Sequence, residues 1–457
     1  PILFNIYINE LPKLLDQTNS DPFILPNGTA ISSLLHADDR IILSRSRYGL
    51  QNSLNQLNEW SKKWLMEINL KKTKIMIFEK HNTKKPKPNF FIGNNLVTQA
   101  KEYNYLGIKL TPTANFKQAN EQLSEKALHS LYKIRRHLNL HLLSPKSASK
   151  IFDSMISPIL LYNSEVWGAY INCDFNKWDN TSTEKTHLKF CKLYLGINRK
   201  ASNLASRAEL GRFPLLIPMY KRIINYITHI IELPETSIVK QAFSLSKELF
   251  KNGKPSFYSH VTKIFKPLCP PLFRNSDNLE TFINNCKQYN ELELIKEKYI
   301  SFWRQNMANS TKLSFYNNIK KEYKTEKYLY LIKNFTQRKM FTQFRISNHK
   351  LEIENGRYKN IPRDQRLCEY CDCNEIEDEY HFVLKCQNYK TLRENSNPIL
   401  KTMFQESLTI ETKMKLFEQM ISSTDEVVII LISDFVKQCI RKREIPQTRT
   451  FDDRVSP

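Results

Sequence analysis

The chain is organised around an acidic stretch near its start, Ile31-Ser32-Ser33-Leu34-Leu35-His36-Ala37-Asp38-Asp39-Arg40-Ile41-Ile42-Leu43-Ser44. Apolar runs flank two adjacent carboxylates, which predicts a β-hairpin with an acidic tip. Like charges repel, and burial would raise the pKa of one carboxyl group unless a cation lies beside it. Nucleotidyl transfer uses such carboxylates to hold two Mg²⁺ ions, although an Asp-Asp pair is also common in solvated turns.

Further secondary structure is predicted on the C-terminal side of the hairpin. Apolar residues at helical spacing predict a helix from Leu50 to Trp64, and the stripe includes both tryptophans. Residues 75–78 read as a strand, and residues 90–110 as a small antiparallel sheet. Lys80 to Pro88 form a basic loop between them. The N-terminal part therefore has an α+β pattern.

From Pro112 onward the pattern is mostly α-helical. Leu123, Ala127 and Leu131 begin an apolar stripe on a helix from Gln118 to Leu138. Basic residues lie away from this stripe: Lys126, Lys133, Arg135 and Arg136. Successive helices then follow from residue 145 to residue 345, separated at prolines.

The composition points to a polyanionic partner. Of 457 residues, 69 are Lys or Arg and 46 are Asp or Glu, so the formal net charge is +23. This excess favours nucleic acid over an anionic membrane, although base bias in the coding DNA would also enrich Lys and Asn. The longest aliphatic run, Val427 to Ile432, is too short for a bilayer span. Because the chain begins with Pro1, we expect it to be a piece of a longer protein.

Four of the nine cysteines lie between Cys368 and Cys386. The pattern Cys368-x2-Cys371-x9-His381-x4-Cys386 predicts a Zn²⁺ site, with Cys373 as a spare thiol that could take the place of Cys371. Zn²⁺ would supply most of the folding free energy of this segment. The scattered remaining cysteines indicate a reducing compartment, the nucleus or the cytoplasm, and not secretion.

Several motifs occur in a specific order along the first 110 residues. They are Pro1–Leu11, then Leu34-Leu35-His36-Ala37-Asp38-Asp39, then Leu50–Trp64 with Asn69-Leu70-Lys71-Lys72-Thr73, and finally Tyr105-Leu106-Gly107. In this order they resemble the reverse transcriptase of LINE-type (non-LTR, jockey-like) retrotransposons. His36 stands where that family usually has Tyr or Phe. Similar segments continue at 160–168, 344–351, 354–358 and 377–382, and the resemblance is weakest between about 235 and 320.

The resemblance implies an RNA-directed DNA polymerase. Its partners would be an RNA template, a DNA primer or target and deoxynucleoside triphosphates. Asp38 and Asp39 would bind Mg²⁺ or Mn²⁺, and Lys72 would lie near the incoming triphosphate. The family's third catalytic Asp lies upstream of this chain, so we expect little or no polymerase activity from the chain alone.

Nucleic-acid contacts are expected at two places. Lys126, Lys133 and Arg136 would face the template–primer backbone. The resemblance also implies nucleic-acid binding near the zinc segment, where the candidates are Arg345, His349, Arg357 and Arg366, each of which could equally be a structural polar residue.

Five segments are predicted from these observations. They are a partial palm (1–110), a thumb-like helical domain (111–235), a helical connection (236–343), a CCHC zinc-binding segment (344–395) and a helical tail (396–457). A non-catalytic remnant that binds nucleic acid through the thumb and zinc regions is the alternative function.

Overall fold

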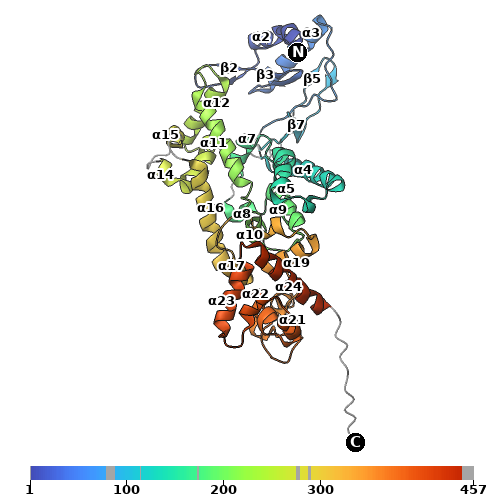
Figure 1. Ribbon diagram of the computed structural model, residues 1–457. Coiled ribbons are helices and arrows are strands. Elements are labelled where there is room, and N and C mark those ends of the chain that lie inside the picture. The colour runs from blue at the N-terminus through green and yellow to red at the C-terminus, as the bar shows by residue number, and fades with distance from the viewer. Residues whose placement is uncertain are drawn as a thin grey trace. The chain divides into compact units, whose positions relative to one another are not determined.

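In a computed structural model, the structure describes residues 2–78, 88–113, 115–171, 174–273, 278–286 and 290–444 (Figure 1). Nearly all of the predicted basic loop from Lys80 to Pro88 lies outside these ranges. The chain divides into two compact units, each assembled from distant segments. Unit 1 comprises Pro1–Leu123, Tyr162–Cys173 and Pro218–Leu292; unit 2 comprises Ser124–Leu161, Asp174–Ile217 and Glu293–Pro457. The five predicted segment borders remain predictions.

Unit 1 begins with two short helices, two hairpins and a longer helix. These elements are α1 (Ile2–Ile8), α2 (Glu10–Gln17), β1 (Phe23–Ile24), β2 (Ala30–Ile31), β3 (Ser33–His36), β4 (Asp39–Ile42) and α3 (Arg47–Lys63). The hairpin of β3 and β4 is antiparallel and pairs Ser33 with Ile42 and His36 with Asp39. The predicted acidic hairpin and the predicted helix are therefore both present.

Helix α3 forms where the sequence supplies a start signal and an apolar face. The Ser46 hydroxyl accepts a hydrogen bond from the Gly49 backbone N–H at 3.1 Å, and Lys62 and Lys63 lie in the last turn, where cations are favoured. A side chain at Gly49 could not fit, because a Cβ there would lie 2.2 Å from the Ser20 carbonyl oxygen. Trp60 is buried against α2, so this residue belongs to the core.

The segment after α3 differs from the prediction. Instead of a strand over residues 75–78, Ile75 forms one isolated parallel bridge with Gln99. Ile75 is buried and Ile77 packs against the same core, but Phe78 is 60% exposed, so the apolar packing ends before the end of the predicted strand. Two separate hairpins replace the predicted sheet: β5 (Phe91–Ile92) with β6 (Asn95–Leu96), and β7 (Tyr103–Tyr105) with β8 (Ile108–Leu110).

Helices form the rest of unit 1. They are α7 (Ser164–Trp167), η3 (Gly168–Tyr170), most of α11 (Leu216–Glu232), α12 (Ile238–Lys251), α13 (Phe257–Leu268), α14 (Pro270–Phe273) and α15 (Leu279–Cys286). Tyr220 of α11 packs edge to face on Phe265 of α13, and Phe265 stacks on Phe282 of α15. Aromatic packing therefore joins these helices into one core.

Unit 2 is helical in the described residues, apart from single β-bridges. It contains most of α4 (Lys117–His137), then η1 (Leu140–Leu142), α5 (Pro145–Ile151), η2 (Phe152–Ile156), α6 (Ser157–Leu160), α8 (Phe175–Trp178), α9 (Ser182–Leu195), α10 (Asn203–Glu209), α16 (Glu291–Ala308), η4 (Thr311–Leu313), α17 (Ser314–Ile319), α18 (Tyr328–Leu331), α19 (Phe335–Arg345), α20 (Glu352–Tyr358), η5 (Arg363–Gln365), η6 (His381–Lys385), η7 (Gln387–Tyr389), α21 (Lys390–Glu394), α22 (Pro398–Lys401), η8 (Thr402–Phe404), α23 (Ile410–Ile421) and α24 (Glu426–Glu444). The chain is therefore mostly helical with small antiparallel hairpins, as predicted.

The last helix, α24, packs against α18, α19 and α23. It contains the longest aliphatic run of the chain, and Ile429 and Ile432 of that run are buried. No helix in the described part of the chain combines the length and the apolarity that a membrane span requires.

Candidate functional site

The two carboxylates of the acidic hairpin lie at its tip. Asp38 is in the turn and Asp39 begins β4, directly opposite His36 on β3. Both acidic side chains and that of His36 are exposed. Ala37 takes a positive φ of 52°, which closes the turn and presents the carboxylates to solvent. No third carboxylate, Cys or His within the described ranges joins this pair as a cluster of metal ligands.

The segment around Lys72 is a tight turn built by Asn69. The Asn69 carbonyl accepts hydrogen bonds from the backbone N–H of Lys72 at 3.1 Å and from that of Thr73 at 2.9 Å. The Asn69 side chain accepts a second bond from the Lys72 N–H at 3.1 Å, and the Thr73 hydroxyl donates to the Asn69 carbonyl at 2.9 Å. These bonds give the Asn-x-x-Lys-Thr spacing a structural reason and leave the Lys72 side chain exposed.

The turn Tyr105-Leu106-Gly107 joins β7 to β8 and rests on Tyr162. Gly107 has a φ of +82°, which glycine adopts without strain, and a Cβ there would lie 3.2 Å from the Tyr162 ring. The Tyr162 hydroxyl donates a hydrogen bond to the Leu106 carbonyl oxygen at 2.9 Å. Burial raises the pKa of Tyr105, and the charge of Asp39 raises it further.

The similar segment at residues 160–168 supports this turn. Asn163 has a positive φ of 53°, and the Tyr162 carbonyl accepts a hydrogen bond from Trp167 Nε1 at 2.7 Å. Trp167 is 1% exposed, so its buried indole holds Tyr162 against Leu106. The segment therefore positions the turn after β7.

The predicted basic helix is present as α4. Leu123, Ala127 and Leu131 are buried along one stripe. Lys126, Lys133 and Arg136 are exposed, as expected for residues that contact a phosphate backbone.

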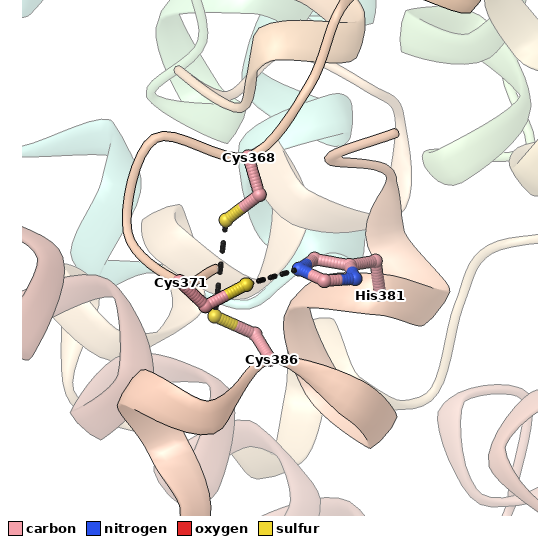
Figure 2. A group of neighbouring side chains, drawn as sticks. All are labelled: Cys368, Cys371, His381 and Cys386. Carbon is pink, nitrogen blue, oxygen red and sulfur yellow. Dashed lines mark hydrogen bonds between the residues drawn. The ribbon is translucent and has the colours of Figure 1, made fainter. Parts of the chain in front are cut away.

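The four predicted metal ligands converge in unit 2. One ligand atom from each of Cys368, Cys371, His381 and Cys386 lies within 4.8 Å of every other (Figure 2). Cys368 Sγ is 3.8 Å from Cys386 Sγ, and Cys371 Sγ is 3.4 Å from His381 Nε2. Three of the four residues are buried. Three thiols and one imidazole at this separation fit a tetrahedral Zn²⁺ ion.

Local backbone structure brings the ligands together. Leu367 and Ile376 form an antiparallel bridge, so the Cys368-x2-Cys371 turn lies between two short extended segments. The π-turn η6 begins at His381. The backbone carbonyl of His381 accepts a hydrogen bond from the Cys386 N–H at 2.8 Å. This i to i+5 bond spans the His-x4-Cys spacing and places both side chains at one end of the turn.

Carboxylates surround the ligands in a second layer. His381 Nδ1 lies 3.2 Å from Glu375 Oε2, so Nε2 faces the thiols. The Asp378 carboxylate accepts a hydrogen bond from the His381 backbone N–H at 2.8 Å. The Cys386 thiol and burial raise the pKa of Cys368 to about 12, so a cation would be needed to hold this residue as a thiolate. Histidine–carboxylate pairs of this kind orient metal ligands.

Helix α24 closes the site from its C-terminal end. The Arg443 guanidinium donates to both carboxylate oxygens of Glu377 and lies 4.1 Å from the centre of the Tyr370 ring. Glu377 also accepts a hydrogen bond from the Glu352 backbone N–H at 2.7 Å. The Cys/His cluster is thereby joined to α20 and α24.

Arg345, a predicted nucleic-acid contact, has a structural role instead. Its side chain is 1% exposed and forms ion pairs with Glu209 at 3.3 Å and Glu326 at 3.0 Å. Burial alone would lower the pKa of Arg345, but these two carboxylates raise it. A guanidinium enclosed in this way cannot reach a phosphate.

The three other candidates near the cluster are also largely engaged within the protein. Arg357 donates to Glu354 Oε1 at 2.8 Å and to the Thr311 carbonyl at 2.8 Å, and a quarter of its side chain is exposed. Arg366 donates to the carbonyl oxygens of Ile353 and Ile361. His349 Nε2 lies 3.0 Å from Glu379.

A buried ionic network around α9 and α10 was not predicted from the sequence. Arg207 Nη1 donates to Asp179 at 2.6 Å and to Glu184 at 2.9 Å, and Glu184 is completely buried. Burial alone would raise the pKa of Glu184, but His187, Arg207 and the Leu215 N–H lower it to about 2. Within α10, the stretch Ser-Arg-Ala-Glu at 206–209 has the composition of a solvated helix surface. The sequence therefore carries no signal that its two charged residues are buried.

Comparison with known proteins relates the N-terminal part to a described family. Residues 1–110 match the family model "Reverse transcriptase (RNA-dependent DNA polymerase)". Over 184 residues the chain is 26% identical to the RNA-directed DNA polymerase from the mobile element jockey of Drosophila funebris, a stretch that covers 39% of this chain and 19% of that protein. It is 22% identical to the probable RNA-directed DNA polymerase from transposon BS of Drosophila melanogaster, with 39% and 20% covered. The matched stretch thus spans about a fifth of these relatives, and the matches confirm the resemblance indicated by the motifs.

Proposed function

We infer that this chain is a fragment of the reverse transcriptase of a non-LTR mobile element, and that the parent protein carries out RNA-directed DNA synthesis. The family match over residues 1–110 supports the reaction class. The adjacent carboxylates Asp38 and Asp39, exposed at the tip of the hairpin, are the observation that supports the site most directly.

Asp38 and Asp39 are the proposed ligands for Mg²⁺ or Mn²⁺ in this site. Their exposed carboxylate oxygens fit hard divalent cations. Bound at these carboxylates, such ions would activate the primer 3′ hydroxyl and stabilise the leaving pyrophosphate. The side chain of Lys72, presented by the Asn69 turn, would neutralise charge on the triphosphate. Tyr162 would keep the turn at Leu106 in place beside the primer.

A complete two-metal site needs a bridging carboxylate that the described residues do not supply near Asp38. We therefore expect the chain alone to incorporate few or no nucleotides on an RNA template with a DNA primer. A chain extended upstream to include an Asp-bearing strand would incorporate them.

Primer extension by the extended chain tests the function. Asp38→Asn and Asp39→Asn should each abolish incorporation, and Lys72→Gln should reduce it. Lys71→Gln is the matched control, because Lys71 is the exposed neighbour of Lys72 in the same turn. Equal incorporation by the wild-type and Asp38→Asn proteins would contradict the proposed site.

The alternative function is nucleic-acid binding without catalysis. The converged Cys/His cluster and the exposed Lys126, Lys133 and Arg136 favour it, because neither feature depends on the acidic hairpin. In this case, salt-sensitive RNA or DNA binding would survive Asp38→Ala with Asp39→Ala, but would fall with Cys386→Ser. A requirement for Mg²⁺ and both carboxylates would contradict it.

A further inference from the structure

Unit 2 contains a cleft of about 340 Å³. Its walls come from the loop between α9 and α10, the loop that follows α19, and helix α20. The residues that matter are Arg199, Lys200, Asn348, Lys350, Glu354 and Tyr358. All of them lie within one compact unit.

The two loops that form the cleft are fixed to each other. The Asn348 side-chain oxygen accepts a hydrogen bond from the Asn198 backbone N–H at 3.0 Å, which joins the loops directly. Ser347 has a positive φ of 51°. Its hydroxyl donates a hydrogen bond at 2.7 Å to the side chain of Glu379, which lies two residues before His381 in the sequence. The cleft is therefore a built part of the fold, tied to the segment that precedes the metal ligand His381.

The charge in the cleft is strongly positive. Arg199, Lys200 and Lys350 are exposed, and among the described residues no carboxylate lies within ion-pair distance of their side chains. Glu354 is the acidic wall residue, but Arg357 at 2.8 Å and Lys312 at 3.4 Å neutralise its charge. Three uncompensated cations around one concave site favour an anionic ligand.

An aromatic ring lies among these cations. Tyr358, near the end of α20, is 58% exposed, and Lys200 Nζ is 5.2 Å from the centre of its ring. An exposed aromatic ring beside cations is the arrangement on which unpaired bases stack. An inorganic anion has no planar face that could stack on this ring.

We infer that the cleft binds a single-stranded nucleic acid, taking one phosphate and an adjacent unstacked base. Arg199, Lys200 and Lys350 contact the phosphate, and Tyr358 stacks on the base. The site deepens the proposed function and rests on it for the class of partner. It also supplies the nucleic-acid contact near the cluster that Arg345, which is buried, cannot provide.

Fluorescence anisotropy with the full zinc-loaded chain tests the site. The probes are a labelled 12-nucleotide RNA strand, the DNA strand of the same sequence, and a duplex of the same length. The test variant is the triple Arg199→Gln, Lys200→Gln, Lys350→Gln. The matched control removes the same charge elsewhere on unit 2, with exposed Lys321, Lys401 and Lys415 changed to Gln.

The test variant should bind the single strands at least about tenfold more weakly than the control at 100 mM salt. Its plot of log Kd against log salt should be shallower by about 0.7 for each phosphate that the variant no longer neutralises. Tyr358→Leu should weaken binding about tenfold because the base can no longer stack, whereas Tyr358→Phe should keep wild-type affinity. Because the substituted residues are exposed, zinc content and melting temperature should not change.

The outcomes separate this inference from the proposed function. If both the triple variant and Tyr358→Leu bind with wild-type affinity, the cleft is not the binding site, whereas the proposed nucleic-acid function is unaffected. Equal binding of the duplex would overturn the single-strand assignment. If the wild-type chain binds none of the three probes at low salt, the proposed nucleic-acid function fails and the inference fails with it.

Discussion

The acidic hairpin of unit 1 and the Cys/His cluster of unit 2 both follow short sequence motifs, but they differ in how completely the fold assembles them. Asp38 and Asp39 are exposed at a turn, with no further ligand gathered beside them among the described residues. The ligand atoms of the four cluster residues converge within 4.8 Å, and Glu375 and Asp378 hold His381 in place.

The difference fits the two kinds of metal site that we propose for these residues. A catalytic metal site in a polymerase must stay open to substrate, so its carboxylates project into solvent. A structural zinc site is closed by four protein ligands and becomes part of the core. We therefore expect substitutions at the cluster to change folding, and substitutions at the hairpin to change chemistry alone.

The largest effect is expected at the cluster. If Zn²⁺ binds here as proposed, Cys386→Ser should abolish stoichiometric zinc binding and unfold the segment around residues 366–390, because a structural metal would supply most of the folding free energy of this segment. Zinc content by atomic absorption and hydrogen exchange of this segment would measure both effects. Cys373→Ser is the control and should keep one zinc ion per chain, because Cys373 lies outside the converged set. An unchanged zinc content in Cys386→Ser would contradict the assignment.

Substitutions of Arg345 and Arg357 should differ in how much they lower the free energy of unfolding, because the first arginine is buried and the second is partly exposed. Arg345→Ala should lower the free energy of unfolding by about 3–5 kcal/mol, because Glu209 would remain buried without its ion-pair partner, whereas Glu326 would keep Lys320. Arg357→Ala should cost about 1 kcal/mol or less, because its side chain is partly exposed. Urea unfolding would measure both. A variant of Arg345 that binds nucleic acid more weakly at full stability would instead support a direct contact by this residue.

Acid should destabilise the buried network of unit 2 in a defined window. The folded pKa of Glu184, about 2, lies below its ordinary value of 4.5, so its stabilising contribution is present above pH 4.5 and is lost as pH falls toward 2. The shift corresponds to about 3 kcal/mol. Fluorescence of Trp178, whose Nε1 donates to Glu184 at 2.7 Å, would follow the loss during urea unfolding at each pH. A free energy of unfolding that stays constant from pH 5 to pH 3 would contradict this role.

A smaller effect is expected where Tyr162 supports the turn between β7 and β8. Tyr162→Phe removes the hydrogen bond to the Leu106 carbonyl and should cost about 1 kcal/mol. Thermal unfolding would measure it, with Tyr330→Phe as a control at an exposed tyrosine. Equal losses in the two variants would show that the turn does not depend on this bond.

The smallest effect on stability is expected at the acidic tip itself. Asp38→Asn combined with Asp39→Asn should change the free energy of unfolding by about 0.5 kcal/mol or less, because both side chains are exposed. The same pair should abolish nucleotide incorporation by an extended chain. A large loss of stability would mean that the hairpin carboxylates are needed for folding, as the residues of the Cys/His cluster are expected to be.

The local features of this protein could be predicted from its residues alone. The acidic hairpin, the helix after it and the basic helix α4 all follow from apolar periodicity and turn residues within about 20 positions. The convergence of Cys368, Cys371, His381 and Cys386 could also be predicted, because their spacing is short enough for local turns to bring them together.

The burial of charged residues depends instead on how distant elements pack. Hydrophilic residues surround Arg207, Glu209 and Arg345 in the sequence, yet all three are buried inside unit 2. Arg207 bonds to Tyr299, and Arg345 bonds to Glu209, which lies 136 residues away in the sequence. The cleft at Arg199 and Lys350 likewise joins two loops that lie 150 residues apart. Hydrophobic periodicity reports the face of one element, whereas the partner of a charge depends on which elements the fold packs together.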